Sequence, residues 1–285
     1  MKLAFLLASV SLSLFSLDSF AASLRVAGSV NDHKLYLTLL KEIVKRSDKY
    51  DSLDYVYAKN GEPAVTRVYA DLEADRLDVY WTATSIELES RFAPVRFPIY
   101  RGMLGMRIGM IHQKDANMLA NVRNKTDMMK YSICSGKTWS DTQILESNGF
   151  TIAKSLKYKN IFEMMLAGNR CHLFARGLME PFNEMRTYPE LPLAVDKHVM
   201  LRYQMPYMFF VNKNNPQLAA HLLQIIEEIF EDGTYEKLFF NEPEVKAVLA
   251  QANVSQRVVI ELENPYLTEA TRSIPKKYFY DPLQP

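Results

Sequence analysis

The stretch KYSICSGKTWSDTQILESNG, residues 130–149, decides the fold, because it joins a short apolar strand to a helix through a glycine corner. The apolar run 131–133 is typical of a buried strand, a helix is predicted from about Ser140, and Gly149 is a helix-ending residue. The Gly-Lys-Thr at 136–138 first suggests a nucleotide-phosphate loop. Such a loop needs another glycine five residues before the Gly-Lys pair, and Tyr131 stands there. We therefore exclude a nucleotide loop.

The strand-to-helix corner at residues 136–141 could still bind another kind of ligand. A strand end and a helix start present unsatisfied N–H groups and the positive end of the helix dipole. Gly136 lets the backbone approach a ligand, and Trp139 offers a flat apolar face. The side chains of Thr138, Ser140 and Asp141 can form hydrogen bonds with a ligand or cap the helix. A capped helix with a buried tryptophan explains these residues equally well.

Strands and helices alternate on both sides of this corner, which predicts parallel sheets covered by helices. Strands are expected at 23–28, 50–58, 77–81, 130–134, 151–158 and 171–177, and helices at 31–47, 63–76, 140–149 and 160–170. Residues 215–240 are expected to form a long helix, a turn at Asp232-Gly233 and a shorter helix. Two β segments, 104–111 and 201–211, bracket the second series. We predict an α/β fold of two lobes, each a mainly parallel sheet flanked by helices, joined by two hinge strands. Ligands of such folds bind between the lobes.

The lobes are assigned to residues 24–107 plus 205–251 and to the inserted segment 108–204, with a C-terminal extension, 252–285. Prolines recur in that extension, and we expect it to be irregular. Residues 1–21 resemble a cleaved signal peptide: Lys2 precedes an apolar run, 3–17, and then DSFAAS. The run is shorter than the roughly 20 apolar residues of a membrane span, although a retained anchor is the alternative. A soluble periplasmic protein is expected.

Composition removes several classes of function. The 34 basic and 33 acidic residues are balanced, so no basic field for nucleic acid exists. The five histidines have no metal-ligand spacing, and no nucleophile elbow occurs, so neither an enzyme nor a cofactor is predicted. An oxidising compartment permits Cys134 and Cys171 to pair, but their offset on neighbouring strands makes a bridge awkward. Two separate buried thiols are favoured, and the bridge stays open.

A family resemblance rests on several motifs in order. The segment VYADLEADRLDVYWTATSIELESRFAPVRFPIYRGMLGMRI, 68–108, resembles the helix, strand, Ser/Thr loop, arginine, "F-x-x-P-Y" and hinge strand of periplasmic (extracellular) solute-binding proteins of family 3, which have the type II periplasmic-binding-protein fold. YSICSGKTWSDTQIL, LAGNRCHLFARG and the NP…DGTY tail at 215–240 are similar to later motifs of that family. The resemblance implies two lobes that close on a small solute by hinge motion.

The resemblance also implies site residues. Arg91 corresponds to the arginine that clamps a ligand carboxylate, for which a guanidinium is chemically suited. The loop before it is one residue longer than usual, so Thr82, Thr84 and Ser85 each qualify as the hydroxyl contact. Arg91 could instead pair with Glu87 or Glu89 on its own helix turn. The complete predicted ligand-binding set is Trp81, Thr82, Thr84, Ser85, Arg91, Gly136, Lys137, Thr138, Trp139, Asp141 and Arg176.

Two departures from the family concern the ligand. The aromatic residue expected after the first strand is replaced by Asn31, Asp32 and His33. Arg176 stands where the amino-acid binders carry the acidic residue that meets the ligand ammonium. A cation repels an ammonium group, which favours an anionic solute. Pairing of Arg176 with Glu180 is the alternative.

The function expected from these observations is capture of a small polar, anionic solute for an ABC-type importer. Two alternatives remain: a ligand-sensing module for a membrane signalling receptor, and an interaction protein that binds no solute. A monomer with a membrane permease or receptor as partner is expected, and the sequence names neither the ligand nor that partner.

Overall fold

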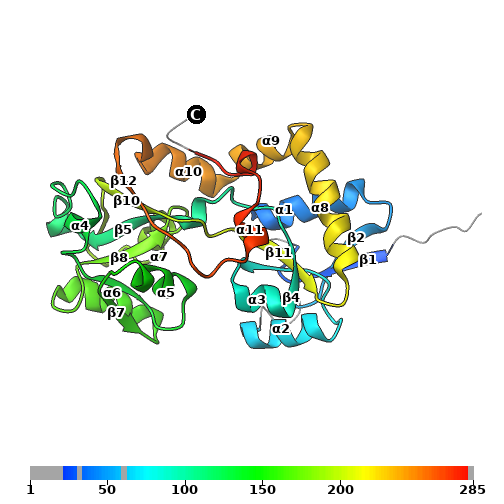
Figure 1. Ribbon diagram of the computed structural model, residues 1–285, viewed down its shortest axis with the longest axis horizontal. Coiled ribbons are helices and arrows are strands. Elements are labelled where there is room, and N and C mark those ends of the chain that lie inside the picture. Colours follow the sequence, from blue (N-terminus) through cyan, green and yellow to red (C-terminus); the bar gives the residue numbers. More distant parts are fainter. Residues whose placement is uncertain (1–21, 31–33, 59–62, 282–285) are drawn as a thin grey trace, which may run out of the picture.

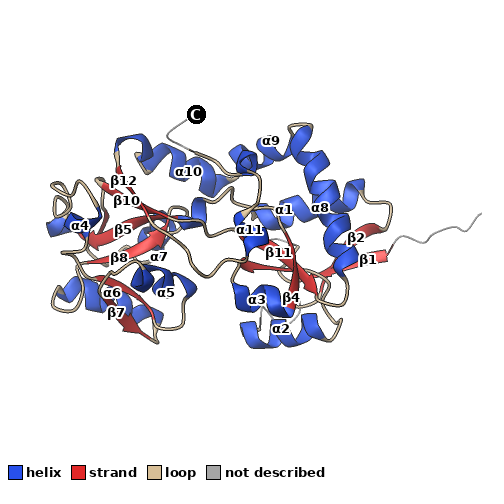
Figure 2. Cartoon of the chain, viewed as in Figure 1, coloured by secondary structure: helices blue, strands red, loops and turns tan. Residues whose placement is uncertain are grey.

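The computed structural model describes residues 22–30, 34–58 and 63–281, and it has two lobes (Figure 1). The predicted signal peptide and the segment Asn31–His33 lie outside the described residues. Helices surround the strands of each lobe (Figure 2). The predicted two-lobed α/β fold is thereby confirmed.

The first lobe is built around parallel and antiparallel strand pairs. Strand β1 pairs in parallel with β2, and β11 pairs antiparallel with both β3 and β4. Helix α1 buries Leu35, Leu39, Leu40 and Ile43, the residues whose helical spacing is visible in the sequence. The elements are β1 (Ala22–Val26), α1 (Leu35–Arg46), β2 (Tyr50–Tyr55), α2 (Val65–Glu73), β3 (Tyr80–Ala83), α3 (Ile86–Arg91), β4 (Phe92–Val95), β11 (Tyr207–Asn212), α8 (Pro216–Glu231) and α9 (Thr234–Asn241). Helix α10 (Pro243–Gln251) runs from α9 toward the second lobe (Figure 1).

The second lobe contains one sheet with strand order β12-β10-β5-β8-β6-β7, and β9 pairs with β5. Strand β6 is parallel to both β7 and β8, whereas β5 is antiparallel to β8, β9 and β10. Gly149 ends its helix as predicted, Gly168 ends another, and both have positive φ. The elements are β5 (Met106–His112), α4 (Lys125–Met128), β6 (Ile133–Gly136), α5 (Ser140–Ser147), β7 (Ile152–Ser155), α6 (Tyr158–Ala167), β8 (Leu173–Gly177), α7 (Pro181–Thr187), β9 (Leu193–Val195), β10 (Val199–Arg202) and β12 (Val258–Glu261).

Two hinge segments, 96–105 and 203–206, connect the lobes between β4 and β5 and between β10 and β11. Gly102 has φ +82°, in the left-handed region that favours glycine, within the turn of the first hinge segment. In the described part of the chain, no helix is both long and apolar enough to cross a bilayer.

The C-terminal tail is only partly irregular, which corrects the expectation from its prolines. The β-branched run 258–260, followed by Glu261, forms β12, which pairs in parallel with β10 at the edge of the second lobe's sheet. The following C-terminal segment, 262–281, crosses to the first lobe and forms α11 (Glu269–Arg272) between the lobes (Figure 1). There Thr268 and Thr271 donate hydrogen bonds to the buried carboxylate of Glu89, 2.9 and 2.6 Å away. The tail therefore contacts both lobes.

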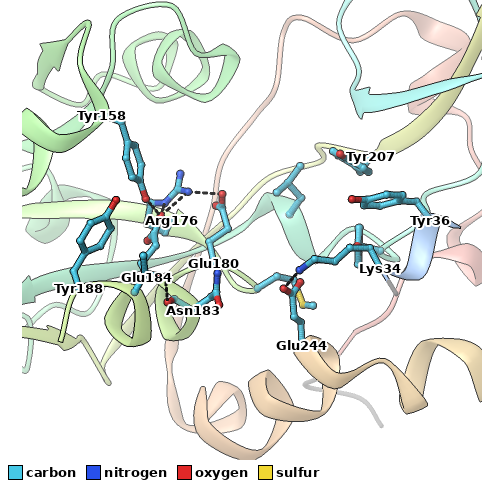
Figure 3. A pocket seen from close by; sticks show the side chains of 14 residues that line it. Lys34, Tyr36, Tyr158, Arg176, Glu180, Asn183, Glu184, Tyr188, Tyr207 and Glu244 are labelled. Carbon is cyan, nitrogen blue, oxygen red and sulfur yellow. Dashed lines mark hydrogen bonds and ion pairs between the residues drawn. The ribbon is translucent and has the colours of Figure 1, made fainter. Parts of the chain in front are cut away.

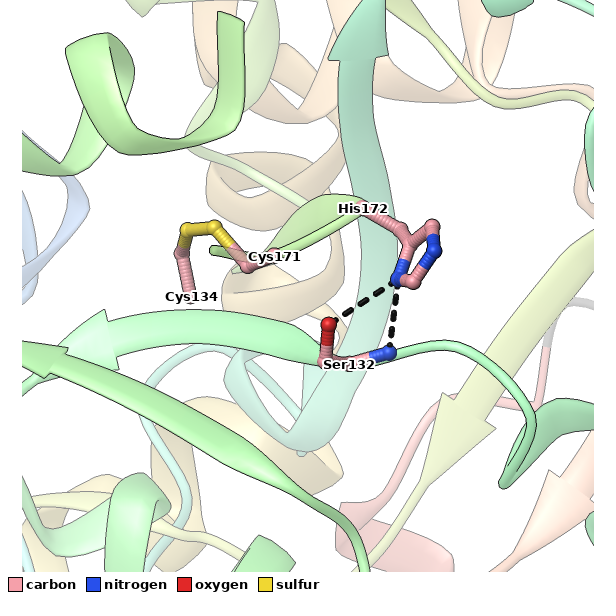
Figure 4. The surroundings of a disulfide bond; sticks show 4 residues. All are labelled: Ser132, Cys134, Cys171 and His172. Atoms are coloured by element: carbon pink, nitrogen blue, oxygen red, sulfur yellow. Dashed lines mark hydrogen bonds between the residues drawn. A yellow bond between two sulfur atoms is a disulfide. The ribbon is translucent and has the colours of Figure 1, made fainter. Parts of the chain in front are cut away.

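Cys134 and Cys171 form a disulfide (Figure 4), although separate thiols were favoured. Cys171 precedes β8 instead of lying within it, so its backbone is not bound by strand geometry. The Cα atoms of the two cysteines are 5.5 Å apart, a normal distance for a bridge. Beside it, the N–H of Ser132 donates to Nδ1 of His172 at 3.0 Å (Figure 4).

The disulfide should stabilise the second lobe. It joins residues separated by 37 positions, and closing a loop of that length is expected to contribute about 4 kcal/mol to the free energy of unfolding. Dithiothreitol should therefore lower the melting temperature of the native protein, measured by circular dichroism. A Cys134→Ala/Cys171→Ala variant should melt at the lower temperature with or without the reductant. Two titratable thiols in the unreduced protein would contradict the bridge.

Candidate functional site

The interlobe cleft, a cavity of about 420 Å³, opens between the lobes (Figure 3). Lys34, Tyr36, Tyr207 and Glu244 project from the first lobe, and Tyr158, Arg176, Glu184 and Tyr188 face them from the second (Figure 3). The remaining lining residues are Tyr100, Leu104, Met179, Glu180, Asn183 and Thr187. Five tyrosines, two cations and three carboxylates thus line the cleft.

The second-lobe wall is formed where β8 ends and α7 begins. Pro181 occupies the first turn of α7, where its missing N–H costs nothing. Glu180 precedes the helix, and its Oε2 accepts a hydrogen bond from the N–H of Gly177 at 2.6 Å. Glu180 and Glu184 lie four residues apart, about one helical turn, and both contact Arg176.

Arg176 forms ion pairs with both of these carboxylates. Its Nη2 is 2.5 Å from Oε1 of Glu180, and its Nε donates to Oε1 of Glu184 at 2.8 Å. Burial alone would lower the pKa of the Arg176 guanidinium, but the two carboxylates outweigh that effect and the pKa is raised. The alternative considered from the sequence, pairing with Glu180, is the arrangement present, with Glu184 added. The charge of Arg176 is therefore already compensated.

A second buried arginine lies beneath this wall. Arg107, on β5, donates from Nη2 to Oδ2 of Asp141 at 2.6 Å, and both side chains are buried. Its Nη1 lies 3.6 Å from Oε2 of Glu180. Burial opposes the charge, but Tyr203, Asp141 and Glu180 shift the net pKa of Arg107 upward. We call Arg107, Asp141, Arg176, Glu180 and Glu184 the charge network; it holds two cations and three carboxylates.

Glu184 has an unused acceptor at the cleft. The hydroxyl of Tyr158 and the guanidinium of Arg176 both donate to its Oε1. The side chain of Glu184 is only 9% exposed, and its other oxygen, Oε2, is buried and has no hydrogen-bond partner. Burial raises the pKa of the Tyr158 phenol, and its hydrogen bond to Glu184 raises it further, so Tyr158 remains a donor. An unpaired buried acceptor costs about 1–3 kcal/mol, which a donor from a ligand would offset.

The first-lobe wall is aromatic. The rings of Tyr36 and Trp81 stack at 4.4 Å between centroids, and Tyr36 lies 6.4 Å from Tyr207. Tyr100 contacts Tyr207 edge-on at 5.7 Å. Lys34 and Glu244 form an ion pair at one side of this wall. Rings that support one another in this way form a rigid surface suited to an apolar or cationic group.

The predicted first-lobe residues do not line the interlobe cleft. Arg91 pairs with Glu73 of α2 at 2.8 Å, neither of the partners expected from its own helix turn. Thr84 is buried and donates to Glu89 at 2.9 Å, and Ser85 caps α3 by accepting from the N–H of Leu88. The ring of Trp81 stacks on that of Tyr36, and Thr82 lies on β3 opposite Met208 of β11. Their direct contact with ligand stays a prediction.

The corner at 136–141 contributes one buried group to the charge network, Asp141. The ring of Trp139 covers Gly136 so closely that a Cβ would overlap it, and it stacks near Phe174 at 6.0 Å. The Arg176 guanidinium lies 5.1 Å from the Trp139 ring centroid. Lys137 and Thr138 are exposed, and the backbone N–H of Lys137 donates to Ser155. Of the predicted set, Arg176 alone lines the cleft.

Several cleft residues escaped sequence reasoning. Two of them could have been found from the sequence. Tyr100 belongs to the segment that resembles the family's "F-x-x-P-Y" motif, and Tyr36 follows the segment in which the family has an aromatic residue. Glu184 and Tyr158 had no such signal, because they meet Arg176 only through the packing of α6 and α7. Among the residues that the structure describes, no cluster of three or more His, Cys, Asp or Glu side chains could hold a metal ion.

Comparison with solved structures shows which proteins share this fold. A probable amino-acid ABC transporter extracellular-binding protein of Bacillus subtilis, YtmK, has a TM-score of 0.58 at 16% identity, covering 79% of this chain and 99% of its own. A structure reported for glutathione import via GshT and the cystine ABC importer TcyBC of Streptococcus mutans has a TM-score of 0.54 at 15% sequence identity. The match covers 78% of this chain and 95% of that one. The GluR0 ligand-binding core with L-glutamate has a TM-score of 0.55 at 12% sequence identity, and the match covers 78% of this chain and 99% of that one.

These likenesses establish the two-lobed type II periplasmic-binding-protein fold suggested by the sequence motifs. No protein-family model matches the chain, and no curated protein sequence matches it significantly.

The Arg107–Asp141 pair should be essential for stability. Arg107→Met leaves Asp141 as a buried carboxylate without its cation, which is expected to cost about 3–5 kcal/mol in urea denaturation. Lys130→Met, which removes an exposed partner of Asp127, serves as the control and should change stability little. Arg107→Met/Asp141→Leu should recover part of the loss, because the carboxylate of Asp141 is then no longer buried without its cation. Equal stability of Arg107→Met and the native protein would show that the pair contributes nothing.

Proposed function

We propose that this protein is an exported solute-binding protein that captures a small solute with an ammonium group in the interlobe cleft and delivers it to an ABC-type importer. The observation that carries the proposal is the buried, unpartnered Oε2 of Glu184 at the wall of that cleft. An ammonium group has several N–H donors and a positive charge, so it satisfies this acceptor better than any neutral donor.

The charge of the cleft supports the same class of solute. Its lining has the cations Lys34 and Arg176 and the carboxylates Glu180, Glu184 and Glu244, one negative charge in excess. Electrostatic attraction in a partly desolvated cleft is stronger than in water, so this excess favours a cation or a zwitterion with its ammonium at Glu184. The anionic solute expected from Arg176 loses its basis, because that guanidinium already has two carboxylate partners.

The tyrosines define the second part of the solute. Tyr36, Tyr100 and Tyr207 present ring surface from the first lobe, and Tyr158 and Tyr188 do so from the second. Aromatic faces bind apolar stems by dispersion and hydrophobic burial, and they also attract cations. Burial raises the pKa of Tyr100, so its phenol remains protonated and available as a donor at neutral pH. We therefore propose an amine or amino acid with an apolar or aromatic portion.

Capture would use the two hinge segments. The walls of the cleft belong to different lobes, so a solute bound to Glu184 and to the ring of Tyr36 contacts both and favours the closed arrangement. The disulfide is consistent with an oxidising compartment outside the cytoplasm. Similar structures include an amino-acid ABC transporter binding protein and a ligand-binding core with L-glutamate, which supports the class of solute without identifying it.

A thermal-shift panel tests the proposal. Amino acids and amines should raise the melting temperature, whereas dicarboxylates and sugar acids should not, because only a ligand of the native state stabilises it. Glu184→Gln keeps the shape of the side chain but removes its charge, and it should weaken binding of the best solute by at least about tenfold in calorimetry. Glu190→Gln, an exposed change six residues away, is the matched control and should bind normally.

Three outcomes would contradict the proposal: stabilisation by anionic solutes alone, stabilisation by no solute, or equal affinity in Glu184→Gln and the control. Arg91→Ala in the same panel tests the predicted carboxylate clamp on α3. Pull-down from membranes with and without the solute distinguishes a permease from a signalling receptor as the partner.

A further inference from the structure

We propose that the chain has a second binding site, for a small oxyanion with two or more negative charges, at the hinge. A hinge cavity of about 460 Å³ shares no residue with the interlobe cleft. Its walls come from both hinge segments, through Arg101, Gly102, Tyr203 and Gln204, and from the C-terminal segment. A ligand there would contact both hinge segments and the C-terminal segment, three of the places where the chain passes between the lobes.

The hinge cavity has an excess of positive charge. Arg101, Arg202, Arg272 and Lys276 line it, opposed by two carboxylates, Glu261 and Asp281. Arg202 pairs with both, at 2.5 Å to Glu261 and 3.1 Å to Asp281. Both carboxylates of the cavity thus contact Arg202, and the four cations exceed the two carboxylates by two positive charges.

The remaining cations have no carboxylate partner among the described residues. Nη2 of Arg272 donates to the carbonyl oxygens of Pro265 and Leu267 at 3.2 and 3.0 Å, and Nη2 of Arg101 donates to that of Lys277 at 3.3 Å. Carbonyl oxygens satisfy hydrogen bonds but leave the net charge uncompensated. Arg101 also has a buried Nε–H without a hydrogen-bond partner. The uncompensated positive charge of the lining indicates an oxyanion.

The cavity is also firmly constructed. Phe279 packs on the turn of the first hinge segment, where a Cβ added to Gly102 would lie 2.7 Å from its ring. The N–H of Tyr280 donates to the carbonyl oxygen of Arg101 at 2.9 Å. The Arg101 guanidinium lies 5.7 Å from the Tyr280 ring centroid. Because Arg272 and Lys276 belong to the C-terminal segment and Arg101 to the hinge, an oxyanion that bridges them would favour the docked arrangement of that segment.

Isothermal titration calorimetry tests the site. The mature protein is titrated with citrate and, separately, with inorganic phosphate, while sodium chloride holds the ionic strength constant. Saturable binding of one equivalent is expected. Lys276→Gln should weaken it about threefold and Arg272→Gln about tenfold. Lys277→Gln removes the same charge one residue away, but Lys277 pairs with Glu231 on α8 and does not line the cavity. That control should bind the anion normally.

Binding of citrate alone would assign a polycarboxylate, and binding of phosphate alone a phosphate group; either supports the site. Absence of saturable binding with both anions overturns it. Equal weakening in Lys276→Gln and Lys277→Gln also overturns it, because the anions would then only screen surface charge. The outcome does not depend on the solute of the interlobe cleft.

Discussion

The second-lobe wall of the interlobe cleft depends on the burial of two arginines, Arg107 and Arg176. Removing a guanidinium from water is costly unless carboxylates and carbonyls surround it. Asp141 of α5, with Glu180 and Glu184 at α7, supplies these groups, so the charge network ties β5, α5, β8 and α7 into one rigid wall. The same requirement orients Glu184, a residue of the cleft wall whose second oxygen is buried and has no hydrogen-bond partner. The ion pairs that stabilise the wall therefore also position the residue that we propose for ligand recognition.

The C-terminal segment adds a constraint to the usual two-segment hinge. It begins at the edge of the second lobe's sheet, contacts Glu89 of α3, and ends against the turn at Gly102. Movement of one lobe against the other must therefore bend this segment or release part of it. The hydrogen bonds from Thr268 and Thr271 to a buried carboxylate make release costly. The hinge cavity lies where these contacts meet, which is why its occupancy would bear on lobe motion.

Much of the fold could be predicted because it follows from local pattern. The helical spacing of Leu35, Leu39 and Ile43 specifies α1, and Gly168 ends α6 because its backbone has to adopt positive φ. The site was less predictable. A helical residue turns by about 100° from its neighbour, so sequence position near a motif does not settle the direction of a side chain. Arg91, the last residue of α3, pairs with Glu73 of another helix, a contact that no local pattern contains.

The sequence by itself determined the order of strands and helices, the insertion of one α/β series between two β segments, and the presence of charged and aromatic residues near the lobe boundary. Periodicity and turn chemistry suffice for these features, because they act between near neighbours in the chain. Tertiary structure alone decided which charges cancel and which face a ligand. Tyr158 and Glu184 are 26 residues apart, and only the packing of α6 against β8 and α7 brings them to Arg176. That packing places a predicted anion-binding arginine in a wall of paired charges, and it leaves one buried carboxylate oxygen, Oε2 of Glu184, without a hydrogen-bond partner.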